Sequence, residues 1–239
     1  MNAVFERLKR IEDPIVRMSL LRTMGAAHWI RRGHGARRNA LSRYLSSTDE
    51  PRLQFGAGPN GLPGWLNSDL TSGDIYLDLG RPLPLPDASF AYAFGEHVIE
   101  HISETAGEVL MAELYRVLKP GGVLRLTTPD LKKIIAIYED RNPRIGRDEY
   151  MRFLGEITGK EVDRPCQALN AYLRSWGHRY VYDEEDLVAK LRKHGFDPVE
   201  RREPGESPHL ALRGVERHGD AAWINEAEAM CVEATRPSG

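Results

Sequence analysis

Short apolar segments alternate with amphipathic helical segments from about residue 50 onward, and this alternation limits the fold more than any other feature. Seven segments have the length and composition of strands, at residues 52–58, 65–70, 74–79, 89–95, 123–129, 197–202 and 208–213. Strands that alternate with helices form a mostly parallel sheet covered on both faces. We therefore predict an α/β domain with a seven-stranded, mostly parallel sheet.

Two amphipathic helices are the clearest local signals. Residues 103–118 begin with Ser103 as a candidate N-cap and end before Lys119-Pro120-Gly121-Gly122. A second helix follows Asp183 and stops at Gly195. The inward face of the first helix is expected to carry Val109, Leu110, Leu114, Val117 and Leu118. The intervening stretch 130–180 interrupts the alternation, and we expect a helical insertion over the carboxyl edge of the sheet.

The chain divides by charge into a basic arm and an acidic body. Residues 1–45 carry ten Lys and Arg against three acidic residues, a net of +7, so the remainder of a chain of net charge −2 carries −9. We predict a helical arm at 1–47, a main domain at 48–217 and a tail at 218–239 that is a short helix at best. The arm either binds an anionic partner, such as a membrane surface, or packs against the acidic body.

Several classes of protein are disfavoured by composition. No apolar run reaches the roughly 18 residues of a membrane span, and the first residues lack the features of a secretory signal. The two cysteines, Cys166 and Cys231, have no metal-binding or redox spacing. We expect a cytoplasmic protein, with peripheral attachment to the inner membrane through the arm as an option.

A glycine turn follows the first strand of the main domain. Gly56-Ala57-Gly58-Pro59-Asn60-Gly61 lies where ligands bind in open parallel sheets, beyond the carboxyl ends of the strands. Glycine allows a ligand to approach the backbone closely. Asp69, at the end of the next strand, is placed to accept hydrogen bonds from ribose hydroxyls, and Asp78 from an adenine amino group. The alternatives are a tight turn without ligand and loop or capping roles for both carboxylates.

Three segments carry a resemblance to a known family. LQFGAGPNGLPGWLNSDL, LDLGRPLPLPDASFAYAFGEHVIEHI and ELYRVLKPGGVLRLTTPDL resemble, in order and spacing, the class I S-adenosylmethionine-dependent methyltransferases. More narrowly, the chain resembles bacterial predicted methyltransferases linked to polysaccharide or glycolipid biosynthesis. The resemblance covers about residues 50–215 and implies a Rossmann-like fold.

The resemblance implies S-adenosylmethionine as cofactor and places specific residues against it. The glycine turn would lie against the methionine portion, Asp69 at the ribose and Asp78 at the adenine. The full set of expected cofactor-binding residues is Phe55, Gly56, Ala57, Gly58, Asn60, Asp69, Leu70, Asp78, Leu79, Gly95 and His97. About ten residues separate Gly58 from Asp69, fewer than a full crossover helix needs, so we predict a curtailed first helix.

A nicotinamide dehydrogenase would use such a turn differently. Its pyrophosphate sits at the N-terminus of a well-formed helix, with an acidic residue about twenty positions further on. Neither condition is met in this sequence, so an oxidoreductase is a distant alternative.

The string His97-Val98-Ile99-Glu100-His101 matches a zinc-peptidase motif. On a helix, His97 and His101 would share a face, but no third ligand is evident and we expect no metal. Histidine suits the removal of a hydroxyl proton near neutral pH. We therefore predict His97 as the catalytic base, followed by His178 and Glu96, and the alternative for His97 is a capping or packing role. His101 is expected to be structural, and Tyr138, Tyr172 and Trp176 are candidates for the acceptor pocket wall.

The predicted function is methyl transfer to a small molecule, sugar or lipid-linked saccharide acceptor, at oxygen. The alternative is a non-catalytic relative that docks on a membrane or an assembly through its basic arm. Methylation of nucleic acid is disfavoured because the main domain is acidic and no basic stripe crosses the predicted pocket.

Overall fold

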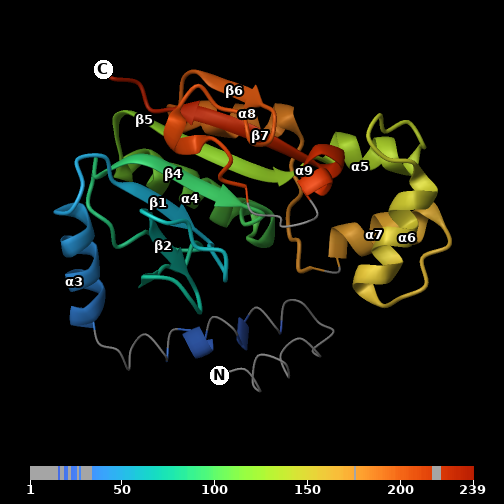
Figure 1. Cartoon of the computed structure of the whole chain (residues 1–239), viewed down its shortest axis with the longest axis horizontal. Helices are drawn as coiled ribbons and strands as arrows, with labels where there is room; N and C mark the ends of the chain where they lie inside the picture. Colours follow the sequence, from blue (N-terminus) through green and yellow to red (C-terminus); the bar gives the residue numbers. More distant parts are fainter. Residues whose placement is uncertain are drawn as a thin grey trace.

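The computed structural model describes residues 34–174, 176–216 and 222–239, with residues 16, 19, 20, 23–25 and 27 before them. One seven-stranded sheet has the order β3-β2-β1-β4-β5-β7-β6. Its pairs from β3 to β5 are parallel, and β7 runs antiparallel to both neighbours (Figure 1). This confirms the predicted mostly parallel sheet. The strands are Arg52–Phe55 (β1), Leu66–Asp69 (β2), Ile75–Tyr76 (β3), Phe90–Glu96 (β4), Leu118–Pro129 (β5), Val199–Arg202 (β6) and Ala229–Thr235 (β7).

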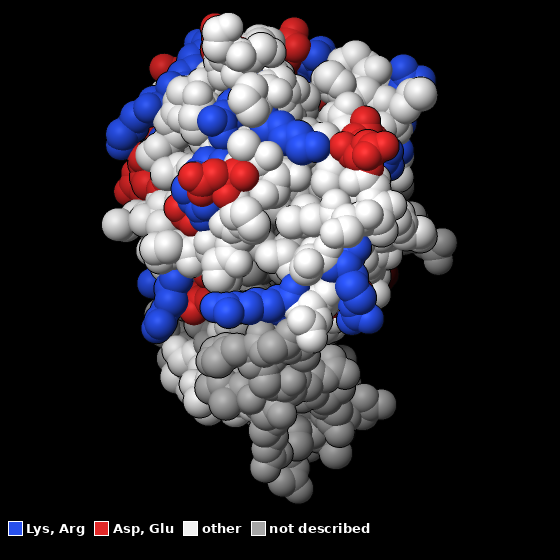
Figure 2. Space-filling model, turned by 90° about the vertical axis from the view of Figure 1, so that its left-hand side faces the viewer, with Lys and Arg blue, Asp and Glu red and all other residues white. Residues whose placement is uncertain are grey.

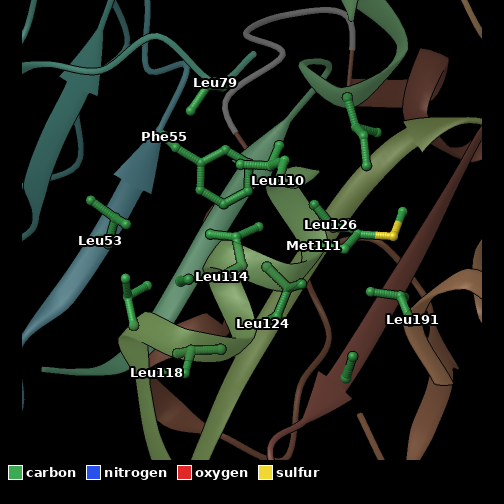
Figure 3. Packing of buried hydrophobic residues seen from close by; sticks show 14 of the residues in the cluster. Leu53, Phe55, Leu79, Leu110, Met111, Leu114, Leu118, Leu124, Leu126 and Leu191 are labelled. Atoms are coloured by element: carbon green, nitrogen blue, oxygen red, sulfur yellow. The ribbon is translucent and has the colours of Figure 1, made fainter. Parts of the chain in front are cut away.

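Helices cover the sheet and extend beyond its edge. In the main core, Leu110 and Leu114 of α4 lie against Leu124 and Leu126 of β5, with Leu191 of α8 nearby (Figure 3). The helices are His34–Leu45 (α3), Glu104–Val117 (α4), Leu131–Tyr138 (α5), Arg147–Thr158 (α6), Pro165–Arg174 (α7), Glu184–Lys193 (α8) and Ala222–Glu228 (α9), with short 3-10 turns at Ile99–His101 (η1) and Leu210–Leu212 (η2).

The two predicted amphipathic helices form as their caps indicate. The Ser103 hydroxyl accepts a hydrogen bond from the Ala106 amide at 3.3 Å, and the Asp183 carboxylate caps α8 in the same way. One inward assignment is wrong. Val109 is 36% exposed, because it lies on α4 outside the stripe that buries Leu110 and Leu114.

The seventh strand lies elsewhere than predicted. Residues 208–213 do not form a strand, since η2 is there and Leu210 is 79% exposed. The strand is β7, inside the tail that we expected to be helical at best, and it is inserted between β5 and β6. Its Val232 pairs with Leu126 of β5. The tail therefore belongs to the fold of the main domain.

The first crossover is curtailed, as the short spacing predicts. Residues 56–65, between β1 and β2, contain turns and no α-helix. The third strand is much shorter than the expected segment 74–79, because only Ile75–Tyr76 pair with β2. The loops that follow β1, β2 and β3 therefore contain no helix that would cover the carboxyl ends of these strands, and this edge of the sheet is open.

The stretch 130–180 forms three helices with a small core of their own. Ile134 of α5, Tyr150 and Leu154 of α6 and Tyr172 of α7 pack together. The group begins directly after β5, where Asp130 caps α5. In Figure 1 the three helices lie to the right of the sheet, beyond the arrowheads of β4 and β5. The insertion is therefore at the carboxyl end of the strands.

Part of the predicted arm belongs to the domain. Leu41 and Tyr44 of α3 pack against the main core, and the Tyr44 hydroxyl accepts from the Arg52 amide at 2.9 Å. A Cβ built on Gly25 would fall 2.0 Å from the Leu70 carbonyl oxygen, so this residue also lies against the body. On the face shown in Figure 2, several Lys and Arg side chains form a row in the lower part of the described surface. The described residues before His34 are helical, and Val16, Leu20 and Met24 among them are exposed. The other predictions for residues 1–33 fall outside the described residues.

Among the described residues, no helix combines the length and apolarity needed to cross a membrane.

Candidate functional site

The glycine turn after β1 has two residues in the left-handed region. Gly56 has φ +65° and Gly58 has φ +53°. A Cβ on Gly56 would lie 2.4 Å from Val98 Cγ2, so this glycine is required by the packing of the segment after β4. A Cβ on Gly58 would meet nothing within 4 Å. The turn therefore touches the β4 segment on one side and faces open space at Gly58.

Asp69 lies beside this turn, as the sequence predicts. It ends β2, and its Oδ2 accepts a hydrogen bond from the Gly58 amide at 3.3 Å. Its Oδ1 accepts from the Thr71 amide at 2.8 Å and the Thr71 hydroxyl at 2.9 Å. The carboxylate thus joins the two loops that end β1 and β2. It holds the glycine turn in shape and remains half-buried at the open edge.

The other predicted cofactor residues divide into loop and core positions. Asp78 follows β3, accepts from the Gly80 amide at 3.1 Å and pairs with Arg81 at 3.5 Å. The side chains of Phe55 and Leu79 are buried in the main core, so they support the site from below (Figure 3). The remaining positions are the buried Ala57, the exposed Asn60, the half-buried Leu70 and Gly95, whose Cβ would lie 2.2 Å from the Phe55 ring.

His97 is at the end of β4 in a strained conformation. Its φ is +49°, which a residue with a side chain rarely adopts. Its Nε2 lies 2.9 Å from Asn225 Oδ1, and its Nδ1 lies 3.2 Å from Glu100 Oε1. The Asn225 amide also donates to Glu96 Oε1 at 2.9 Å. Two predicted catalytic residues, Glu96 and His97, are therefore held by one asparagine of α9.

The contacts of His97 raise the pKa of its imidazole. Burial alone would lower the pKa of His97, but the adjacent Glu100 carboxylate outweighs burial and raises it to about 9. Burial would raise the pKa of Glu100, but the contact with His97 outweighs burial and lowers the pKa of that carboxyl to about 2. His97 is therefore an imidazolium at neutral pH in this arrangement, and differs from the free base that we predicted.

A cavity of about 340 Å³ opens beyond β4 and β5. His178 enters it from the segment after α7, and burial lowers the pKa of that imidazole to about 4, so His178 is neutral. Tyr138, a predicted wall residue, does not line the cavity. The lining residues are His97, Glu100, His101, Pro129, Phe153, Ile157, Tyr172, Trp176, His178, Ile224 and Glu228.

Several residues of this region escaped sequence reasoning. Asn225 and Glu228 come from α9, in the tail that we did not assign to the domain. The Thr128 hydroxyl donates to Glu100 Oε2 at 3.0 Å from the end of β5. The string His97–His101 was the available signal, and its fourth member, Glu100, is the fully buried carboxylate at the centre of the cluster.

The edge at β1 and β2 fits the adenosine and methionine portions of S-adenosylmethionine. Open space above Gly58 admits a ligand to the backbone, and a carboxylate stands at the end of β2 for ribose hydroxyls. The cavity is lined by His97, whose neighbour Val98 packs on Gly56. The segment after β4 therefore contacts both the glycine turn and the cavity.

Comparison with known proteins gives a partial match to one family. Residues 67–126, which run from β2 into β5, match a family model described as a methyltransferase domain. No curated protein matches the chain.

Solved structures with a similar shape include several methyltransferases. One is Haemonchus contortus phosphoethanolamine N-methyltransferase 2 with S-adenosyl-L-methionine (16% identity, 86% of this chain and 53% of that chain, TM-score 0.47). Another is an S-adenosylmethionine-dependent methyltransferase from Archaeoglobus fulgidus (16% identity, 82% of this chain and 90% of that chain, TM-score 0.46). A third is Burkholderia thailandensis 1,6-didemethyltoxoflavin-N1-methyltransferase (13% identity, 95% of this chain and 92% of that chain, TM-score 0.46).

The chain spans about half the length of the Haemonchus enzyme, 53% of it, and identities this low assign no substrate. The family match is the finding that bears on function: the segment from β2 into β5 matches a methyltransferase domain, and it lies in a mostly parallel, Rossmann-like sheet.

Proposed function

We propose that this protein methylates a hydroxyl oxygen of a small polar acceptor, in the class of sugars and lipid-linked saccharides. S-adenosylmethionine supplies the methyl carbon: a bond forms from the acceptor oxygen to that carbon, the carbon–sulfur bond breaks with its electron pair left on sulfur, and the hydroxyl proton passes to solvent. Such an in-line displacement depends mainly on alignment and on exclusion of water.

The single observation that carries this proposal is the cavity beside the glycine turn. Val98 packs on Gly56, and the next residue toward β4, His97, lines the cavity. An acceptor in this space would lie beside a cofactor bound at the ends of β1 and β2. The fold therefore provides two adjoining spaces at one edge of the sheet, as a two-substrate transfer requires.

The walls of the cavity suit a polar acceptor with apolar faces. Phe153, Tyr172 and Trp176 offer flat aromatic surfaces, against which the C–H face of a sugar ring can pack. Both ring nitrogens of His97 are already engaged, by Asn225 and Glu100, whereas the neutral His178 offers one donor and one acceptor nitrogen. A polar group of this kind among aromatic walls can fix the orientation of a hydroxyl.

Blocking the cavity tests this assignment. Ile157 lines it and is 49% exposed, so Ile157→Trp should fill the space at little cost in stability. We expect transfer of a labelled methyl group to a panel of sugar and lipid-linked saccharide acceptors to fall at least about tenfold, because a misplaced acceptor loses alignment. Binding of S-adenosylmethionine should be unchanged. Ile135→Trp on α5 is the matched control, since Ile135 is 42% exposed and lies outside the cavity.

Two results would count against this assignment. Equal transfer by Ile157→Trp and the wild type would place the acceptor outside the cavity. Cofactor binding without transfer to any acceptor in the panel would favour a non-catalytic binding or scaffold role.

We also propose that the basic N-terminal segment attaches this cytoplasmic enzyme to the inner membrane. The support is the excess of ten Lys and Arg over three acidic residues in residues 1–45. Sedimentation with anionic vesicles should then decrease as salt increases, and equal sedimentation with neutral vesicles would contradict this attachment.

A further inference from the structure

Three potential metal ligands converge at the inner end of the cavity. Glu100 and His101 belong to η1, and His178 comes from the segment after α7. One donor atom from each lies within 4.8 Å of the other two. The rings of His101 and His178 meet edge to face, with centroids 5.0 Å apart. Residues nearly 80 positions apart in sequence thus present two imidazoles and a carboxylate to one point.

Each of the three residues has one buried side-chain atom without a hydrogen bond within the part of the chain that the structure describes. Glu100 Oε1, His101 Nδ1 and His178 Nδ1 are buried without a hydrogen bond. A buried polar atom without a partner costs roughly 1–3 kcal/mol, and such atoms are rare in folded proteins. Glu100 is fully buried, and its Oε1 lies 3.2 Å from His97 Nδ1 and 3.8 Å from His101 Nε2. Three such atoms in one place indicate a missing ligand.

The surrounding backbone and side chains hold the three residues in place. The Arg179 amide donates to the Glu100 carbonyl at 2.7 Å, which holds the segment of His178 against η1. The Thr128 hydroxyl donates to Glu100 Oε2 at 3.0 Å and leaves Oε1 directed toward the histidines. Hydrogen bonds of this kind orient metal ligands in proteins.

The structure provides the third potential metal ligand, which was not evident in the sequence. We expected no metal because no third ligand was evident beside His97 and His101. The string instead bends at His97 and forms the short turn η1, and the Nε2 of His97 is taken by Asn225. The third donor is His178 of the insertion.

We propose that Glu100, His101 and His178 bind one divalent transition-metal cation of the Zn²⁺, Mn²⁺, Fe²⁺ or Co²⁺ class. Two imidazoles and a carboxylate are a donor set for these ions, and metal–ligand bonds are about 2.0–2.2 Å long for zinc. Two donors bound to one such ion lie at most about 4.4 Å apart, so the separations of up to 4.8 Å in this cluster have to close only slightly. Three protein ligands leave coordination positions open toward the cavity, as at catalytic metal sites.

The cation gives the cavity a means of binding the acceptor. A hydroxyl oxygen of the acceptor occupies an open position, which orients it and favours loss of its proton to solvent. This use of the metal rests on the proposed methyl transfer, whereas the binding of the metal does not.

Cobalt titration tests the site directly. Tag-free protein is dialysed against a chelator and then titrated with Co²⁺, whose visible absorption reports coordination by nitrogen and oxygen donors. We expect one equivalent to bind and saturating Zn²⁺ to raise Tm, because a ligand that binds only the folded state stabilises it. His178→Ala and His101→Ala should each weaken Co²⁺ binding at least about 100-fold, since even outer partners of metal ligands are worth about 10–100-fold.

His194→Ala is the matched control, because His194 pairs with Glu108 on α4 outside the cavity and should leave Co²⁺ binding unchanged. Circular dichroism confirms that each variant is folded. Wild-type protein that binds none of Co²⁺, Zn²⁺ and Mn²⁺ stoichiometrically, or a folded His178→Ala that binds them as tightly as the wild type, would overturn the site. S-adenosylmethionine titration of the same samples separates this outcome from failure of the proposed function, since metal binding is measured without the cofactor.

Discussion

Two glycines of the β1–β2 turn share a left-handed backbone but differ in surroundings. Gly56 is closed in by Val98, whereas Gly58 faces open space. The sequence pattern predicts that both approach a ligand, and a pattern cannot separate the two cases. Packing against Val98 depends on a residue 42 positions away, which only the folded chain brings near.

Alanine at each glycine separates packing from ligand binding. Gly56→Ala should lower the free energy of unfolding by about 2–4 kcal/mol, because an overpacked Val98 adds to backbone strain. Gly58→Ala should lower it by about 1 kcal/mol, the cost of the positive φ alone, while weakening S-adenosylmethionine binding. Urea unfolding and calorimetric titration measure the two effects. If Gly58→Ala bound the cofactor as tightly as the wild type, the open space above this residue would not be the ligand site.

The catalytic candidates show where residue-level prediction from sequence ends. Histidine at the end of β4 and a carboxylate at the end of β2 follow from strand order. The state of His97 does not, because it is set by Glu100 and by Asn225, which lies 128 positions further along the chain. The raised pKa of His97 favours the imidazolium, whereas the sequence predicts a free base.

At the scale of elements, local signals identified helices better than strands. α4 and α8 carry their own caps and apolar stripes, so their positions follow from sequence. β7 was missed because Glu233 interrupts its apolar run. That glutamate is buried and pairs with the buried Arg125 of β5 at 2.7 Å. The negative charge of Glu233 is neutralised by Arg125, and the sequence does not show that these two residues are paired.

Removal of β7 should abolish folding. A chain that ends at Glu228 loses the strand that joins β5 to β6, and it exposes the apolar surface that β7 covers. We expect no cooperative thermal unfolding transition by circular dichroism. A chain that ends at Arg236 loses only exposed residues and should melt as the full chain does. A native-like transition in the shorter protein would mean that β7 is an appendage.

At the scale of the whole molecule, the architecture was the most predictable feature. Alternating strands and helices with a short first crossover yield a mostly parallel sheet with an open edge, and the structure has both. The cavity was not predictable in the same way. It arises where the insertion, with its own core, meets the ends of β4 and β5 and the helix α9. Such a space depends on the packing of three distant segments.

The central claim is that this edge of the sheet binds S-adenosylmethionine through the glycine turn and Asp69. Calorimetric titration of the dialysed protein tests it, with Asp69→Ala as the variant and Asp74→Ala as the matched control. Asp74 accepts from the Asn67 amide at 2.9 Å and thus ties a neighbouring loop without facing the glycine turn. The account predicts binding by the wild type and by folded Asp74→Ala, and loss of binding in folded Asp69→Ala. Folded wild-type protein that binds neither S-adenosylmethionine nor S-adenosylhomocysteine, or an Asp69→Ala variant that binds as the wild type does, would contradict it.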